Sequence, residues 1–416
     1  LNRPDVDTIY VCTDSGREGE YIYRLVAQMA GVKGKVQKRV WIDSQTEEEI
    51  QRGIREAKPM SAYENLGKSG IMRTIEDYAM GINFSRVMSV KYGGLLNNAA
   101  GTRSYTAIAV GRVMTCVLGM VVIREREIRN FKETPFYRVV GSFTDANIEA
   151  EWKVVEGSKY FESPLLYKEN GFREKKDALA LIDRVQGHSV IVESIEKNIS
   201  RKRAPLLFNL AELQAECAKR FKISPDETLQ VAQDLYERKL TTYPRTDARV
   251  LSTPVAKEIH KNISRLRGYE PTSDFVERIL DRKLYGNIAG TQYTDDAKVT
   301  DHYAIIPTGQ GLNNLRNLSE LSAKVYETIV RRFLGIFYPP AVYQKVALVT
   351  EIGGEQFFSN FRVLVQEGYL KAMQYSFFRK KEEDDEGRKE DETTCDPSFL
   401  AALSQLQKGS ELNLLD

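Results

Sequence analysis

The beginning of the chain contains a short apolar segment, a glycine-bearing acidic turn and an amphipathic segment, in that order. Residues 8–12 are typical of a buried strand, because β-branched and aromatic side chains suit a pleated surface. The apolar residues after the turn recur at helical spacing, at Ile22, Leu25, Val26 and Met29. A strand, a turn and a helix predict an α/β unit, whose turn lies at the carboxyl edge of the sheet, where such folds bind ligands.

The turn over residues 13–20 supplies two carboxylates, Asp14 and Glu18, that can face this edge. Such oxygen ligands suit Mg²⁺, which typically takes one or two protein carboxylates and completes its shell with water and phosphate. A structural interpretation is equally open, because Asp14 can cap the following helix while Glu18 and Glu20 favour its first turn. Asp14 and Glu18 are therefore metal-ligand candidates with an ordinary structural alternative.

A second feature is the segment over residues 239–249, in which a β-favouring run ends at Pro244 and charged residues follow. Proline has no N–H to donate, so we expect strand pairing to stop there, with Tyr243 at the strand end. Arg245 lies two residues further on, and therefore on the same side of an extended chain. A tyrosine hydroxyl has a pKa of about 10 and needs a nearby cation or base to act as a nucleophile near neutral pH. The alternative is a core strand tyrosine capped by a surface turn.

Two more segments carry candidate ligand-binding residues. Residues 109–115 open a long predicted helix, where Gly111 allows close approach of a ligand and Arg112 with free N–H groups suits a phosphate. Arg73 and Asp77 lie one turn apart on another predicted helix. The structural alternatives are a loop-to-helix junction with a surface arginine, and a solvated ion pair between Arg73 and Asp77.

His302 lies between a charged turn and an apolar run, within residues 295–308. A lone histidine is usually structural, so this residue is a candidate only. The chain has three histidines and four widely separated cysteines, without a Cys-x-x-Cys pair. This composition argues against a zinc ribbon and a histidine-cluster metal site, and scattered cysteines suit a reducing compartment.

Length and composition favour a multidomain cytoplasmic protein. The chain has 416 residues, of which 42% are hydrophobic, and no apolar run approaches the roughly 18 residues of a membrane span. Its start has no signal-peptide core, and its length suggests about two to four domains. The net charge of +2 is too even to indicate nucleic-acid binding, so only local basic patches could do so. Residues 379–392 form a charge run, typical of solvated or disordered chain.

The middle of the chain changes to a β-rich pattern. We expect strands over residues 137–140, 148–155, 189–195, 343–350 and 356–365, the last two returning to the domain of the first three. Nearer the start of the chain we expect a second strand over residues 40–42. We expect helices over residues 46–57, 61–80, 176–185, 252–265 and 321–337, and a loop over 91–108. A helix pair over residues 206–238, followed by the Tyr243 run, resembles a winged-helix arrangement.

Four separated stretches together resemble the type IA DNA topoisomerases, and most closely the topoisomerase III branch. They are residues 14–20 (DSGREGE), 110–115 (VGRVMT), 240–247 (LTTYPRTD) and 302–308 (HYAIIPT). Each motif alone is weak, but their order and rough spacing match the family over roughly residues 5–375. The resemblance implies a transient single-strand break, passage of a second strand and resealing without ATP. The chain accordingly has no Gly-x-x-x-x-Gly-Lys-Ser/Thr loop.

The resemblance also implies residue roles. Tyr243 would attack a phosphodiester of single-stranded DNA and hold the 5′-phosphate covalently. Arg245 would position Tyr243 and steady the phosphate charge, and His302 would lie near the scissile phosphate. Asp14 and Glu18 match the Mg²⁺-binding edge of the Toprim domain, with Glu18 also in the catalytic set. The implied DNA-binding set comprises Gly111, Arg112, Val113 and Thr115 at the helix start, with Arg73, Asp77 and Lys298 as weaker members.

The implied fold class is multidomain α/β plus α+β, arranged as an incomplete type IA ring. The expected parts are a partial Toprim α/β domain (residues 1–60), a helical DNA-binding domain (61–134), a β-rich gate domain (135–204 and 336–378), a winged-helix-like catalytic tyrosine domain (205–335), and a charged linker and tail (379–416). The implied cofactor is Mg²⁺ and the implied partner is DNA, chiefly single-stranded, without zinc or a membrane.

The chain departs from the family pattern in three ways. Gly16 stands where the acidic turn usually has a second Asp, so we expect weaker or single-metal Mg²⁺ binding. Family members also begin with a strand that carries a Glu and a Lys, and we expect this chain to start after that strand. They end with a helical segment that closes the ring, and we expect this chain to lack that segment. We therefore expect poor relaxation of supercoiled DNA by this chain alone.

Two other classes of protein compete with this interpretation. The chain could be a piece of such an enzyme that binds single-stranded DNA without cutting it. A tyrosine relaxase or recombinase also uses a tyrosine on DNA, but a relaxase needs a histidine cluster for its metal, and three dispersed histidines do not supply one.

Overall fold

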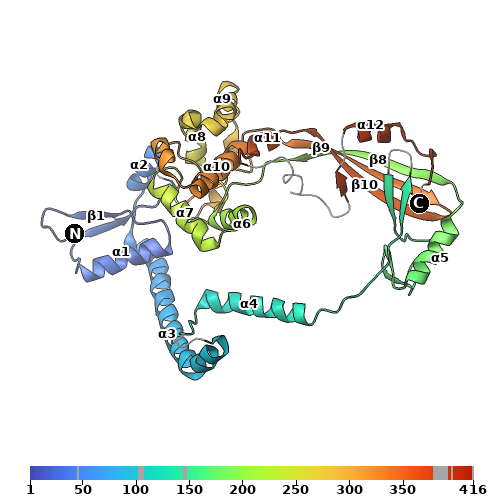
Figure 1. Cartoon of the computed structure of the whole chain (residues 1–416). Coiled ribbons are helices and arrows are strands. Elements are labelled where there is room, and N and C mark those ends of the chain that lie inside the picture. The colour runs from blue at the N-terminus through green and yellow to red at the C-terminus, as the bar shows by residue number, and fades with distance from the viewer. Residues whose placement is uncertain (45, 102–106, 144–147, 378–391, 395–396, 415–416) are drawn as a thin grey trace. The chain divides into compact units, whose positions relative to one another are not determined.

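The computed structural model describes residues 1–44, 46–101, 107–143, 148–377, 392–394 and 397–414 (Figure 1). The chain divides into two compact units. The first unit comprises Leu1–Lys132, Arg245–Glu258 and Thr294–Ala304, and the second comprises Glu133–Pro244, Ile259–Tyr293 and Ile305–Asp416.

Helices and strands are mixed along the chain, which confirms the coarse fold class. The strands are β1 Thr8–Val11, β2 Val36–Arg39, β3 Lys58–Pro59, β4 Val140–Phe143, β5 Ile148–Trp152, β6 Leu166–Lys168, β7 Gly171–Phe172, β8 Val190–Lys202, β9 Ala341–Ile352, β10 Glu355–Gln366, β11 Glu392–Thr394 and β12 Glu411–Leu412. The helices are α1 Arg17–Met29, α2 Glu47–Arg55, α3 Glu64–Ala100, α4 Arg112–Arg129, α5 Lys175–Val185, α6 Leu210–Phe221, α7 Pro225–Glu237, α8 Thr253–Arg265, α9 Ser273–Asp281, α10 Glu320–Gly335, α11 Leu370–Met373 and α12 Pro397–Gln405.

The first unit begins with the predicted α/β arrangement. β1 and β2 pair in parallel and are joined by α1, and Ile9, Val11 and Tyr23 form a small core between the strand and the helix. The second strand, predicted over residues 40–42, lies earlier, because β1 ends at Val11 and offers no partner beyond it. The N–H of Val40 still donates to the Val11 carbonyl at 3.0 Å.

The helix predicted over residues 61–80 is much longer. α3 continues to Ala100 and ends at Gly101, which adopts the left-handed conformation with φ of 65°. The predicted loop over residues 91–108 is therefore wrong for its first ten residues, and residues 102–106 lie outside the described part of the chain. The glycines near residue 93 were misleading, because a glycine ends a helix only where the backbone needs a positive φ.

The second unit contains a seven-stranded sheet with the order β12–β8–β9–β10–β5–β4, in which β11 pairs with β10 off this path. β8 and β9 pair antiparallel from Val190–Ile352 to Lys202–Ala341. The strands after α10 thus return to the sheet begun before α5, as the sequence predicted. β12 also joins this sheet by pairing with β8, whereas residues 378–391, which hold nearly all of the predicted charge run, lie outside the described part.

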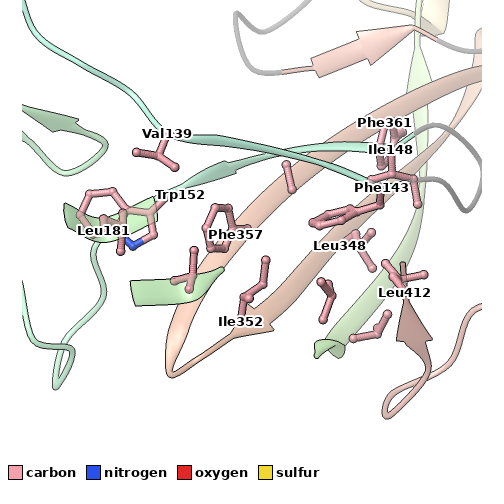
Figure 2. Packing of buried hydrophobic residues seen from close by; sticks show 14 of the residues in the cluster. Val139, Phe143, Ile148, Trp152, Leu181, Leu348, Ile352, Phe357, Phe361 and Leu412 are labelled. Atoms are coloured by element: carbon pink, nitrogen blue, oxygen red, sulfur yellow. The ribbon is translucent and has the colours of Figure 1, made fainter. Parts of the chain in front are cut away.

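The core of this sheet is apolar and closely packed (Figure 2). Trp152 is fully buried, and its ring stacks on Phe172 with centroids 4.9 Å apart. The indole N–H of Trp152 donates to Glu355 Oε2 at 3.0 Å, and Arg184 Nη1 lies 2.7 Å from Glu355 Oε1. These two partners compensate the burial of a carboxylate that would otherwise be costly. Among the described residues, no helix is both long enough and apolar enough to cross a membrane.

Candidate functional site

The acidic turn of the first unit leaves its two candidate carboxylates exposed. Gly16 is the N-cap of α1 and makes no side-chain capping bond, so the alternative in which Asp14 caps the helix is wrong. The backbone carbonyl of Asp14 instead accepts a hydrogen bond from the N–H of Gly16 at 2.8 Å. The side chains of Asp14 and Glu18 are both exposed. They are therefore available to a ligand at the carboxyl end of β1.

A buried ion pair fixes the backbone of this turn. Arg39 and Glu20 are both fully buried, with Arg39 Nε 3.0 Å from Glu20 Oε2. Nη1 of the same guanidinium donates to the carbonyls of Val11 at 3.1 Å and Thr13 at 2.6 Å, and Nη2 donates to the Asp14 carbonyl. The sequence interpretation missed this role of Arg39, for which the only signal was a basic residue at the end of a segment followed by apolar residues.

The side-chain space at Gly16 is occupied by another carboxylate. A Cβ atom on Gly16 would lie 2.5 Å from Asp301 Oδ1 and 2.7 Å from Oδ2, so only glycine fits while Asp301 keeps this position. Desolvation, together with the neighbouring carboxylates of Asp14 and Asp247, raises the pKa of Asp301. The sequence interpretation assigned no role to Asp301, because nothing in the sequence brings it to the acidic turn.

His302 lies next to Asp301 on a segment held by backbone contacts. Thr246 Oγ1 donates to the His302 carbonyl at 2.7 Å and accepts the N–H of Ala248 at 3.1 Å. The N–H of Ala304 donates to the Val250 carbonyl at 3.0 Å. The structure thus brings the His302 segment, the segment after Arg245 and the acidic turn into the same unit.

Tyr243 belongs to the second unit, where a short bridge replaces the predicted strand. α7 ends at Glu237, and Lys239 adopts a positive φ of 63°, which turns the chain back. Thr241 then forms an isolated bridge with Pro307, and the N–H of Thr242 donates to the Ile306 carbonyl at 3.0 Å. The pairing cannot lengthen into a ladder, because Pro244 and Pro307 have no N–H to donate.

The side chain of Tyr243 is half-buried, with its ring edge-to-face against Tyr236 of α7. The centroids of the two rings are 5.3 Å apart and the interplanar angle is 73°. Tyr243 therefore lies at the end of the bridged segment, as predicted, and Arg245, which is exposed, belongs to the first unit. The assembly of Tyr243, Arg245, His302 and Glu18 into one catalytic centre stays a prediction.

A second place in the first unit gathers most of the predicted DNA-binding residues. The start of α4 and the middle of α3 line a cleft of about 600 Å³ that includes Arg73, Asp77, Gly111, Arg112, Val113 and Thr115. Arg112 donates to both carboxylate oxygens of Asp77, at 3.1 and 3.3 Å, and Arg73 lies 3.7 Å from Asp77. These contacts lower the pKa of Asp77 and raise that of Arg112.

Two serines of α3 position the start of α4. Ser85 and Ser89 are one turn apart, and their hydroxyls accept the N–H groups of Val110 at 2.9 Å and Ile108 at 2.8 Å. These bonds hold residues 108–110 along α3 and deliver Gly111 to the N-cap of α4. Lys298 is not among the residues that line the cleft, and its exposed ammonium pairs with Asp295 at 2.8 Å.

Comparisons with known proteins agree with these features. A family model described as DNA topoisomerase matches residues 61–414. DNA topoisomerase 3 of Bacillus subtilis (strain 168) is 33% identical over 415 residues, covering 99% of this chain and 51% of that protein. DNA topoisomerase 3 of Bacillus licheniformis is 33% identical over 415 residues, covering 100% of this chain and 51% of that protein. Full-length topoisomerase I of Thermotoga maritima has a TM-score of 0.61 and 20% identity, covering 96% of this chain and 57% of that structure.

The chain belongs to the DNA topoisomerase family. Within the family it is a type IA protein similar to topoisomerase III, in agreement with the resemblance found in the sequence. The chain spans about half the length of the curated relatives that it matches. The likeness to the Thermotoga maritima enzyme supports the mixed helix and sheet fold.

Proposed function

We propose that this chain provides the DNA-binding and tyrosine-bearing part of a type IA topoisomerase. The observation that carries the proposal is the cleft between α3 and α4, which gathers six of the seven residues in the expected DNA-binding set. Those residues come from stretches more than thirty positions apart in the sequence. Arg112 and the helix N-terminus beside it supply donors that suit a DNA phosphate.

The proposed reaction uses the Tyr243 hydroxyl as the nucleophile. Its oxygen forms a bond to phosphorus, the bond from phosphorus to the 3′-oxygen of the neighbouring nucleotide breaks, and the hydroxyl proton passes to solvent or a base while the leaving oxygen gains one. Arg245 and His302 steady the charge on the phosphate. The reverse attack by the 3′-hydroxyl reseals the strand, and the phosphotyrosine bond conserves the energy, so ATP is not needed.

The donor set at the acidic turn suits a weak Mg²⁺ site. Asp14 and Glu18 are exposed carboxylates, and Asp301 fills the side-chain space that Gly16 leaves. In the described part of the chain, no three His, Cys, Asp or Glu side chains are grouped closely enough to hold a metal ion. Proteins nevertheless commonly bind Mg²⁺ through only one or two carboxylates, with water and phosphate as the other ligands. When bound, Mg²⁺ would neutralise charge on the DNA phosphates.

For Mg²⁺ itself, isothermal titration calorimetry on the 416-residue chain is expected to show one weak site. The variant Asp14→Asn/Glu18→Gln should weaken the binding at least about tenfold, because each change removes a charged oxygen ligand. Asp5→Asn is the matched control, since Asp5 is exposed and paired with Arg3. Two tight Mg²⁺ sites in the unaltered chain would contradict the proposal.

For DNA, Arg112→Ala is expected to weaken binding of a labelled single-stranded oligonucleotide and to reduce the slope of log K against log salt by about 0.7, the loss of one phosphate contact. The control is Arg124→Ala on the same helix, where the side chain is exposed and pairs with Glu127. Fluorescence anisotropy at several salt concentrations measures both quantities. An unchanged salt slope in Arg112→Ala would show that Arg112 does not contact a DNA phosphate.

The experiment that decides between cleavage and simple binding is a search for the covalent adduct. The chain is incubated with labelled single-stranded DNA and Mg²⁺, denatured, and digested to locate the attached residue. A 5′-phosphotyrosine at Tyr243 supports the proposal. Tight binding without any adduct favours the alternative, a module that holds single-stranded DNA without cutting it.

A further inference from the structure

The second unit contains a cavity of about 910 Å³, which we call the α9 cavity. Its walls come from the end of β8, from α9 and the loop after it, from the segment after α10, and from the turn into α11, all within one unit. None of its lining residues belongs to the acidic turn, the Tyr243 segment or the cleft between α3 and α4. Its volume is in the range of sites that take a small ligand or a nucleotide.

Four cations line the α9 cavity, namely Arg203, Arg278, Arg282 and Lys371, against the single acid Glu367. Within the described residues, none of the four has a carboxylate at ion-pair distance, and Glu367 pairs with none of them. Arg278 and Arg282 are one helical turn apart, so their charges repel each other. Cations gathered without a counter-ion around a concave surface favour binding of an anion.

The neighbouring tyrosine does not supply the missing negative charge. Burial raises the pKa of Tyr338 to about 12, although the charges of Arg278 and Arg282 act in the opposite direction. The hydroxyl is therefore neutral near pH 7 and donates to the carbonyl of Phe275 at 3.0 Å. Among the described residues that line the cavity, Glu367 is the single acid, so the cations can accept an anionic ligand.

Aromatic rings also line the cavity, and contacts with neighbouring residues hold them in place. Phe275 and Tyr338 meet edge-to-face with centroids 6.1 Å apart. Tyr293 donates its hydroxyl to the Ala204 carbonyl at 2.8 Å, which anchors a third ring of the lining. The side chains of Asn287 and Gln292 also line the cavity, and amides can both donate to and accept from the edge of a nucleobase.

We propose that the α9 cavity binds a nucleotide of single-stranded DNA, with its phosphates on Arg278 and Arg282 and its base against Phe275 and Tyr338. Basic grooves with aromatic platforms hold single strands in this way without reading their sequence. This inference rests on the proposed function, because that function is the reason for choosing DNA as the anionic ligand. The α9 cavity would give the DNA strand a further non-covalent contact, in addition to the cleft between α3 and α4. All of its lining residues belong to the second unit.

The test compares two variants of the whole chain that lose the same charge. Arg278→Ala/Arg282→Ala removes two cations of the α9 cavity, whereas Lys175→Ala/Lys176→Ala removes two exposed cations at the start of α5. Anisotropy with a labelled oligothymidylate is measured from low to moderate salt. The first variant should bind about tenfold more weakly and lose about 1.4 from the salt slope, two phosphate contacts at about 0.7 each. The second should bind like the unaltered chain.

Direct localisation uses an oligonucleotide that carries 5-iodouracil, photo-crosslinked to the chain and mapped by mass spectrometry. Crosslinks to peptides that contain Phe275, Tyr293 or Tyr338 support the proposal. Loss of these crosslinks on addition of thymidine monophosphate at a comparable concentration would make a free nucleotide the occupant and overturn the assignment to DNA.

The outcomes separate this inference from the proposed function. If Arg278→Ala/Arg282→Ala binds with unchanged affinity and salt slope while Arg112→Ala is impaired, the α9 cavity is not a DNA site and the proposed function stands. If the unaltered chain neither binds single-stranded DNA nor forms an adduct, both fall. The variant Arg278→Lys/Arg282→Lys keeps the charges and should retain most of the salt slope, which separates an electrostatic role from a structural one.

Discussion

Replacing Tyr243 with phenylalanine is expected to reduce the covalent DNA adduct by at least about a thousandfold, because the change removes the nucleophilic oxygen and leaves the ring in place. The edge-to-face contact with Tyr236 does not need the hydroxyl, so the bridged segment should keep its conformation. Binding of single-stranded DNA should change little, since phosphate contacts supply most of the affinity. The adduct is measured after denaturation with end-labelled DNA.

The matched control is Tyr236→Phe, which removes a hydroxyl from the ring partner of Tyr243. We expect this variant to form the adduct at nearly the normal level. If Tyr243→Phe still cleaves DNA, another residue is the nucleophile and the proposed mechanism is wrong. Equal loss in both variants would instead indicate that the pair of rings supports the local fold.

The second large effect is expected at Arg39. Replacing Arg39 with alanine leaves the buried Glu20 with Arg24, 2.8 Å away, as its remaining ion-pair partner. The change also removes the donor that serves the carbonyls of Val11, Thr13 and Asp14. Breaking a buried ion pair from one side costs about 3–5 kcal/mol where the remaining charge has no partner. The pair with Arg24 reduces this cost for Glu20, and the lost hydrogen bonds destabilise the backbone of the acidic turn. We expect the first unit to unfold at a clearly lower denaturant concentration, and Mg²⁺ binding to weaken with it.

The chain offers a local probe for this measurement. It has two tryptophans, and Trp41 lies beside the Arg39 guanidinium, 5.4 Å from ring centre to Cζ. Trp152 is buried in the sheet of the second unit, so its replacement by phenylalanine in a background variant isolates the signal of Trp41. Arg3→Ala is the control, because its pair with Asp5 is exposed and exposed ion pairs contribute little to stability. Equal denaturation midpoints for Arg39→Ala and Arg3→Ala would refute the structural role of Arg39.

Local pattern predicted most of the regular elements. The helix over Lys175–Val185, the helix pair before Tyr243 and the return of β9 and β10 to the sheet were all indicated by periodicity and caps. The errors came where a partner element set the limits. β2 lies earlier than predicted because β1 is short, and the Tyr243 segment forms a bridge in place of a strand because Pro307 faces it. The ends of such strands depend on the segment that pairs with them, and the local sequence pattern holds no information about that segment.

The family and its candidate residues followed from the sequence by itself, because short motifs carry the residue types that the chemistry needs. Tyr243, Arg245, His302, Asp14 and Arg112 were all named in this way. Only the tertiary structure decided that Asp301 fills the space beside Gly16, that Arg39 holds the acidic turn, and that Arg278 and Arg282 share a cavity with Arg203. These relations join residues far apart in the chain, and they arise from packing and from the need to partner buried polar groups, which no local pattern encodes.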